Sequence, residues 1–239
     1  MRILFIPDGN RRAARKLGLS YEEAYSLAAA KTDMVVKHLL RREEVDALVF
    51  YGLSYDNITK RSLEEMEPIY LVQENQYVKW VEDPFFSMYG VRVRFAGEFK
   101  QLRRSSVLPG SLPESYMKAA KQLEEATETN SRKQLYGLIG YSSKIELKRA
   151  FERMENQPGV EELDGPKVNP IDILPFLDLP ISIDLVIRTG QEQRISDCLL
   201  YQTAYAEFIF LEKYFPEIDE RDLETCLLEF KKRERRYGR

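Results

Sequence analysis

The stretch ILFIPDGNRR at residues 3–12 is the strongest indication of the fold, because it joins a short apolar run to a glycine turn and the charged start of a helix. Its first four residues lack polar alternation, which is typical of a strand buried on both faces, as in a parallel sheet. A strand that passes through a Gly turn into a helix presents free backbone N–H groups at the carboxyl edge of the sheet, where α/β proteins bind anions. The stretch therefore predicts an α/β fold with an anion site at that edge.

Comparable apolar runs recur along the chain, with amphipathic stretches between them. We expect strands at residues 3–6, 47–53, 91–95, 135–139, 184–187 and 208–211. Strands that alternate with helices indicate one α/β domain over residues 1–239, with a mainly parallel sheet surrounded by helices.

The sequence contains recognisable signals for the N-termini of the helices. A long helix is predicted over 21–42, and three capping-box patterns mark further helix starts: Ser62 with Glu65, Ser111 with Glu114, and Ser143 with Glu146. Five prolines between residues 156 and 180 predict a loop there, with one short helix near 171–177.

The composition limits which partners and which cellular compartment can be expected. With 239 residues, 44% of them hydrophobic and 31% charged, the chain can bury a sizeable core. The net charge of −3 argues against nucleic acid as the main partner. No apolar run reaches the length of a membrane span, so at most a peripheral membrane contact is expected. Cys198 and Cys226 lie in separate apolar runs, which suits unpaired thiols in the reducing cytoplasm.

The turn at residues 8–12 combines one acid with several cations. Arg11, Arg12 and Arg15 supply donors suited to phosphate oxygens. Asp8 would repel a bare phosphate, so its place beside these arginines suggests a bridging Mg²⁺. Taken alone, the same residues also fit an ordinary Asp-Gly turn followed by a charged helix face.

A second polar cluster follows the apolar run at 184–187. Arg188 and Gly190 end this run, and Arg194 and Ser196 come shortly after it. Two arginines and a hydroxyl at the end of a strand form a plausible second diphosphate site. The local alternative is a pair of surface arginines that form ion pairs with Glu192 and Asp197.

Together these segments resemble the cis-prenyltransferases, typified by undecaprenyl diphosphate synthase. The family signatures appear as DGNRR (8–12), YGLSYDN (51–57), DLVIRTGQEQRIS (184–196), AYAE (204–207) and RERRYG (233–238), in the family's order. The resemblance spans nearly the whole chain. It implies a six-stranded, mainly parallel sheet with surrounding helices, and a homodimer.

The resemblance also implies where the donor substrate binds. An allylic prenyl diphosphate would lie on the first loop, where Asp8 would act as a catalytic residue and hold Mg²⁺. The phosphate oxygens would contact Gly9, Asn10, Arg11 and Arg12. An allylic diphosphate ionises toward a carbocation, so metal and arginine must stabilise the departing diphosphate.

On the acceptor side, the resemblance implies that isopentenyl diphosphate, or a related isoprenoid, is held by Arg188, Arg194 and Ser196. Glu207 would complete the metal or acceptor network, and Ser54 and Asn57 would lie near the proton that is lost. In a homodimer, the tail that contains Arg235 would reach the partner's phosphate site; the alternative for this basic tail is a solvated surface.

Several positions depart from the family pattern. Tyr25 and Tyr21 take the places of a family His and Arg, and Lys60, next to Arg61, takes the place of another Arg. We expect Tyr25 and Lys60 to line the substrate site in their stead. Gln191 replaces the second Gly of the family's turn. These changes predict intact donor ionisation with an unusual acceptor or product, such as a short chain or a non-head-to-tail linkage.

Two rival functions remain at this stage. Accessory subunits of eukaryotic cis-prenyltransferases bind isoprenoid without catalysis, but typically lack the acid of the first loop, so Asp8 favours an enzyme. A nucleotide- or phosphosugar-binding α/β protein is the more distant rival, and no GxGxxG or Walker motif supports it.

Overall fold

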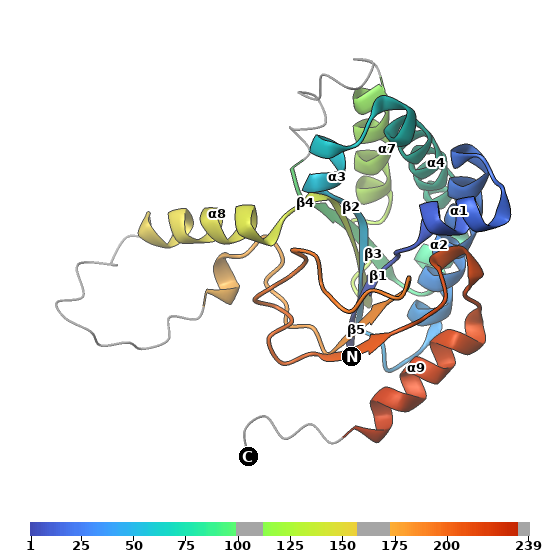
Figure 1. Cartoon of the computed structure of the whole chain (residues 1–239). Coiled ribbons are helices and arrows are strands. Elements are labelled where there is room, and N and C mark those ends of the chain that lie inside the picture. The colour runs from blue at the N-terminus through green and yellow to red at the C-terminus, as the bar shows by residue number, and fades with distance from the viewer. Residues whose placement is uncertain (99–111, 157–172, 234–239) are drawn as a thin grey trace.

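Six parallel strands form the centre of the molecule (Figure 1). The computed structural model describes residues 1–98, 112–156 and 173–233. The strands are β1 (Arg2–Ile6), β2 (Ala47–Ser54), β3 (Val91–Ala96), β4 (Lys133–Tyr141), β5 (Leu185–Arg188) and β6 (Glu207–Phe210). Their order is β3-β4-β2-β1-β5-β6, and each neighbouring pair is parallel. All six predicted strands are confirmed, with bounds that shift by at most two residues.

Helices connect the strands and cover the sheet. They are α1 (Asn10–Leu17), α2 (Tyr21–Arg41), α3 (Tyr55–Lys60), α4 (Leu63–Val81), α5 (Pro84–Met88), α7 (Leu112–Ala126), α8 (Ser143–Glu155) and α9 (Glu220–Lys232), with 3₁₀ turns η1 (Leu174–Phe176) and η2 (Phe215–Glu217). The predicted long helix and the capping box at Ser62 and Glu65 are confirmed. The short helix expected near 171–177 is η1, and Ser111 lies outside the described residues.

The capping box predicted at Ser143 is wrong by one residue. Ser142 is the N-cap of α8, and its Oγ accepts a hydrogen bond from the Ile145 amide at 3.4 Å. Glu146 is buried and accepts hydrogen bonds from the Leu179 amide at 3.1 Å and from Gln202 Nε2 at 2.9 Å. The pattern failed because this glutamate points into the protein interior and not toward the start of its own helix.

The two faces of the sheet are covered differently. On one face, the strand side chains pack against residues of α2, α4, α5, α7 and α9. On the other face, they pack against the irregular segment around Leu179–Leu199. Helix α8 extends away from the sheet (Figure 1), and a small apolar cluster together with a hydrogen bond from Arg153 to the Phe176 carbonyl joins it to η1. None of the described helices combines the length and apolarity needed to cross a bilayer.

Candidate active site

The carboxyl ends of β1 and β5 are joined through Asp8. Its Oδ2 accepts a hydrogen bond from Arg188 Nη2 at 2.7 Å, and its Oδ1 lies 3.1 Å from Arg12 Nη2. The Thr189 hydroxyl accepts from the Asp8 amide and donates to the Asp8 carbonyl, both at 2.8 Å. The two signature loops, about 180 residues apart in sequence, therefore form one polar site, as parallel pairing of the strands requires. Nothing in the local sequence around Thr189 indicated its role as a clamp.

Glycines allow this close approach. Gly190 has a φ of +90°, and a Cβ there would lie 2.8 Å from the carbonyl carbon of Asp8. Gly9 has a φ of +101°, and its Cβ would lie 2.7 Å from the Tyr214 ring. Both positions need the left-handed region and the absence of a side chain. Gln191, by contrast, adopts φ +68° without being glycine, so the turn persists although the family's second Gly is missing.

The first turn of α1 faces the same site. The first amides of a helix have no intrahelical acceptor, and they attract anions. The Oδ1 atom of Asn10 is buried and has no hydrogen-bond partner in the described part of the chain. Arg11 pairs with Glu65, and Arg12 pairs with Glu192 at 3.0 Å. The carboxylates hold both guanidinium groups at the mouth of the cavity while leaving further N–H donors for a ligand.

Arg188 is the most buried cation of the site. Its side chain donates to Ser196 Oγ at 2.9 Å and to the Arg194 carbonyl, while its Nε has no partner among the described residues. Arg194 pairs with Glu192 and remains largely exposed. The structure thus brings Arg188, Arg194 and Ser196 together, as predicted, beside Asp8.

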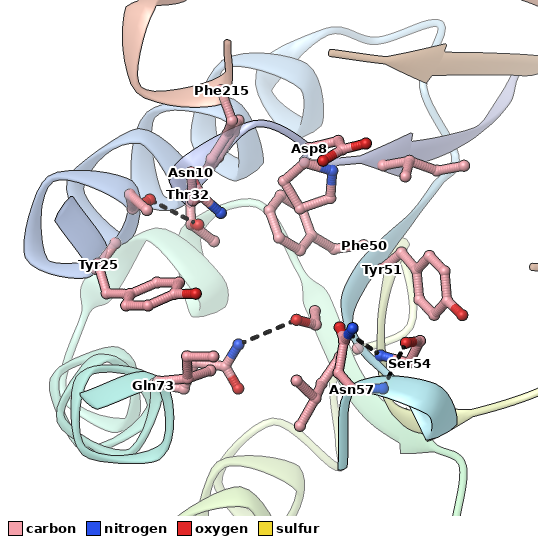
Figure 2. A pocket seen from close by; sticks show the side chains of 18 of the residues that line it. Asp8, Asn10, Tyr25, Thr32, Phe50, Tyr51, Ser54, Asn57, Gln73 and Phe215 are labelled. Carbon is pink, nitrogen blue, oxygen red and sulfur yellow. Dashed lines mark hydrogen bonds between the residues drawn. The ribbon is translucent and has the colours of Figure 1, made fainter. Parts of the chain in front are cut away.

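A cavity of about 490 Å³ extends from this polar mouth into the protein (Figure 2). Asp8, Asn10 and Arg188 line its mouth, and its deeper walls are mainly apolar, including Phe50, Leu53, Ile69, Trp80, Val93 and Leu135. Its volume is typical of small-molecule sites. A charged mouth joined to an apolar interior suits an amphiphile with an anionic head and a hydrocarbon tail.

Ser54 and Asn57 face the cavity next to Tyr51 (Figure 2). Ser54 ends β2 and is the N-cap of α3. Its Oγ accepts from the Asn57 amide at 3.1 Å, and Asn57 Oδ1 accepts from the Ser54 amide at 3.4 Å. This reciprocal cap fixes both side chains at the site where the resemblance places them.

The structure replaces one predicted binding residue by its neighbour. Lys60 is 69% exposed, forms an ion pair with Asp56 at 2.7 Å, and does not line the cavity. Arg61 does line it, and its Nη1 donates to the Tyr25 hydroxyl at 3.4 Å. The prediction assigned the position of the family Arg to Lys60 from its spacing in the sequence. It failed because α3 ends at Lys60, and the chain then turns Arg61 toward the cavity.

Arg61 is a cation that Glu65 and Asp8 influence electrostatically without forming an ion pair with it. In the part of the chain that the structure describes, no carboxylate lies within ion-pair distance of its guanidinium group. Burial lowers the pKa of Arg61, and burial raises the pKa of the adjacent Tyr25 hydroxyl. An unpaired, largely buried charge is costly, so this position favours an anionic ligand at the mouth.

The residues can accommodate Mg²⁺ only in part. No group of three or more His, Cys, Asp or Glu side chains among the described residues could enclose a metal ion. Mg²⁺ is, however, commonly held by one or two carboxylates together with substrate phosphates and water. Asp8, at the mouth and close to unsatisfied polar groups, fits that role.

Glu207 does not join Asp8 within one chain. Strand pairing places Glu207 opposite Leu185, at the amino end of β6, whereas Arg188 pairs with Phe210 at the carboxyl end. Glu207 instead accepts a hydrogen bond from Arg233 at 2.9 Å. The sequence already indicated this position, because Glu207 comes directly before the residues that were predicted to form this strand, at its amino end. Arg235 lies outside the described residues.

Comparisons with known proteins match this geometry. A family model described as putative undecaprenyl diphosphate synthase matches residues 6–238. The chain belongs to this family. The predicted cis-prenyltransferase resemblance is therefore confirmed, and with it the enzyme class, a prenyltransferase.

Curated relatives of this prenyltransferase match along its full length. It is 34% identical to a tritrans,polycis-undecaprenyl-diphosphate synthase (geranylgeranyl-diphosphate specific) of Pyrobaculum aerophilum, with 99% of this chain and 95% of the relative covered. It is 32% identical to isoprenyl transferase 1 of Streptomyces coelicolor, with 99% and 81% covered.

Solved structures show the same fold. Lavandulyl diphosphate synthase from Lavandula x intermedia, in complex with dimethylallyl diphosphate, superimposes with a TM-score of 0.85 at 22% identity, with 100% of this chain and 98% of that one covered. A probable undecaprenyl diphosphate synthase from Campylobacter jejuni gives 0.74 at 24% identity, with 100% and 99% covered.

Proposed function

We propose that this prenyltransferase is Mg²⁺-dependent, ionises an allylic prenyl diphosphate at the loop of residues 8–12, and transfers the prenyl group to isopentenyl diphosphate. The observation that carries the proposal is the cavity with a charged mouth, lined by Asp8 and Arg188, and a mainly apolar interior. The named activity of the Pyrobaculum relative, an undecaprenyl diphosphate synthase specific for geranylgeranyl diphosphate, supports an allylic donor.

The donor site would act on the leaving group. When the allylic C–O bond breaks, the diphosphate keeps the electron pair, and negative charge grows on its oxygens. The first amides of α1, together with Arg11, Arg12 and Arg61, lie at the mouth where that charge would develop. Donors that are already oriented stabilise such charge most effectively. A bound Mg²⁺, held by Asp8 and the phosphates, would neutralise part of the same charge.

The acceptor site would hold a second diphosphate beside the first. Arg188, Arg194 and Ser196 line the cavity mouth next to Asp8. The acceptor alkene would then attack the allylic carbon, and a proton would leave the adjacent carbon. Ser54 and Asn57, fixed by their reciprocal cap, face the cavity where this step would take place.

We further propose a homodimer across the β6 side of the molecule. Strand β6 ends the sheet, and the segment before it exposes Leu200, Tyr201 and Tyr205, the last by 73%. Exposed aromatic clusters of this kind are common at protein interfaces. A dimer on this side would place Glu207 and Arg233 close to the partner. Cytoplasmic localisation stays a prediction, which the two free, buried cysteines fit.

The test is product analysis. The purified chain is incubated with Mg²⁺, radiolabelled isopentenyl diphosphate and allylic diphosphates of increasing length, and parallel samples contain a chelator. We expect labelled prenyl diphosphates only with Mg²⁺. A regular Z-polyprenyl ladder would contradict the predicted short or irregular product, and no transfer with any allylic donor would contradict the proposed function itself.

A further inference from the structure

The acceptor side of the mouth contains a short backbone run in an unfavourable conformation. Ser196, Asp197 and Leu199 have φ angles of +50°, +59° and +49°, and none of them is a glycine. The left-handed region is costly for residues with a Cβ, and such residues persist in it where the surrounding structure fixes them. Ser196 lines the cavity, whereas Asp197 and Leu199 do not. The contacts that hold this run must therefore include some that lie outside the cavity.

The start of α8 supplies such contacts through Asp197. The Asp197 carboxylate accepts hydrogen bonds from Ser142 Oγ at 2.5 Å and from the Lys144 amide at 3.3 Å. Its carbonyl accepts from the Ser143 amide, and Ser143 Oγ accepts from the Leu200 amide, both at 3.0 Å. Ser142 and Ser143 are buried, which shields these bonds from water. A carboxylate at the first turn of a helix is also favoured by the helix dipole.

Ser196 connects these contacts to the mouth. Its Oγ accepts from Arg188 Nη1 at 2.9 Å, and its carbonyl accepts from the Tyr51 hydroxyl at 3.4 Å. Arg188 and Tyr51 both line the cavity. The Ser196 hydroxyl is thus held by Arg188 on the cavity side and by its covalent neighbour Asp197 on the outside.

Other contacts hold the donor side of the mouth. Asp8 is fixed by Arg188, Arg12 and Thr189, and its carbonyl accepts from the Phe215 amide at 3.0 Å. In the described part of the chain, none of these five residues forms a hydrogen bond or ion pair with α8. A change at the start of α8 should therefore affect the acceptor side and leave the donor side in place.

We propose that Asp197 is a positioning residue for the acceptor: by joining its own backbone run to the start of α8, it keeps the Ser196 hydroxyl where it can bind the acceptor's diphosphate. This inference rests on the proposed function. Without the carboxylate, the run can relax out of the left-handed region, and Ser196 moves with it. Binding of the acceptor must then order the run again, which lowers the affinity for the acceptor. The affinity for the donor is retained.

The first test compares two substitutions of Asp197. Asp197→Ala removes the carboxylate, and Asp197→Asn is the matched rescue, because asparagine keeps an acceptor oxygen and tolerates the left-handed region. We expect Asp197→Ala to raise the KM for isopentenyl diphosphate about 10-fold, the factor expected for one hydrogen bond to a charged group. Asp197→Asn should recover most of this loss. The KM for the allylic diphosphate should stay near the wild-type value in both variants.

The second test starts from the other partner. Ser142→Ala removes a donor to Asp197 and should also raise the KM for isopentenyl diphosphate. The control is Arg153→Met, which weakens the contacts of α8 with Phe176 and Asp178 and leaves those with Asp197 in place. It should leave both KM values unchanged. Should Asp197→Ala fail to fold, Ser142→Ala decides the outcome.

A binding measurement separates positioning from a general loss of stability. An allylic S-thiolodiphosphate, which ionises poorly, is titrated first by calorimetry, and isopentenyl diphosphate is then titrated into the complex. Circular dichroism verifies folding. We expect Asp197→Ala and Ser142→Ala to weaken the second titration only, and Arg153→Met to weaken neither.

The possible results separate this inference from the proposed function. Unchanged acceptor affinity in the folded variants, an equal loss for donor and acceptor, or no recovery in Asp197→Asn would overturn the role of Asp197. No transfer by the wild type with any allylic donor would instead refute the proposed function.

Discussion

At the mouth of the cavity, several polar atoms are left without partners, whereas behind the apolar wall most polar side chains named here are paired, with the buried Tyr70 hydroxyl as an exception. Asn10 Oδ1 and Arg188 Nε are buried and unsatisfied, and Arg61 forms no ion pair with any described residue. Behind the apolar wall, the Tyr116 hydroxyl donates to Gln73 Oε1 at 2.7 Å, and Trp80 donates to Asp33. The mouth is built to receive charge from a ligand, and the far end is built to keep its shape.

The largest expected effect would come from the acid at the mouth. Asp8→Ala should lower kcat by about 10³-fold, comparable to the loss of a preorganised charge-stabilising group. Steady-state assays with labelled isopentenyl diphosphate measure this, with circular dichroism to verify folding. The control is Asp56→Ala, which removes an exposed carboxylate whose ion-pair partner among the described residues is the exposed Lys60. A kcat of Asp8→Ala within a few-fold of the wild-type value would contradict the proposed role of Asp8 in holding Mg²⁺ at the mouth.

Arg61 and Lys60 provide the next test, because they are adjacent but point to different sides. A hydrogen bond to a charged group contributes about 1.5–3 kcal/mol, so Arg61→Leu should lower kcat/KM by roughly 10- to 100-fold. Lys60→Met should change kcat/KM little, since its side chain is exposed and off the cavity. If Lys60→Met lowered kcat/KM and Arg61→Leu did not, Lys60 would be the binding residue, as the family spacing predicts, and the geometry described here would be wrong.

The same contrast explains what could be predicted. The mouth is made of short motifs at the ends of buried strands, and parallel pairing brings such ends together, so Asp8, Arg188 and Asn57 could be assigned from sequence. A one-residue change in where α3 ends was enough to exchange Lys60 for Arg61. Glu207 lies away from Asp8 of the same chain, which the motif alone could not indicate because a motif gives a residue type but not the edge of the sheet.

The far end could not be predicted in the same way. Its wall combines α2, α4, β3 and β4, and the residues that meet there, such as Asp33 and Trp80, are 47 positions apart with no motif around them. Apolar periodicity predicted the long α2 but could not distinguish a side chain that fills the core from one that lines a cavity. Such contacts depend on the packing of whole elements.

A glycine in β4 tests how tightly the deep wall is packed. A Cβ at Gly137 would lie 2.5 Å from the Phe95 ring. Gly137→Ala should therefore displace that ring and lower the free energy of unfolding by about 1–3 kcal/mol, the usual cost of overpacking. Urea unfolding measures the loss. The displaced ring should also shorten the products while leaving the rate of the first transfer nearly unchanged. An unaltered unfolding midpoint would mean that the deep wall yields easily and does not keep its shape.

The smallest effect is expected for one hydroxyl behind that wall. Burial raises the pKa of Tyr116, whose hydroxyl contacts Tyr77 at 3.1 Å and Gln73 at 2.7 Å. Tyr116→Phe removes both contacts and deprives the buried Tyr77 hydroxyl and the part-buried Gln73 Oε1 of this partner, so the free energy of unfolding should fall by about 1–2 kcal/mol. Tyr89→Phe is the control, since its hydroxyl has no hydrogen bond among the described residues.

Tyr116 lies behind the cavity wall and does not line the cavity. The KM for isopentenyl diphosphate should therefore stay at the wild-type value in Tyr116→Phe, while Gln73 and Tyr77, freed from their common partner, should broaden the distribution of product lengths. A raised KM with an unchanged distribution of product lengths would mean that the hydrogen bonds of Tyr116 affect substrate binding at the mouth. The mouth and the deep wall would then be energetically coupled.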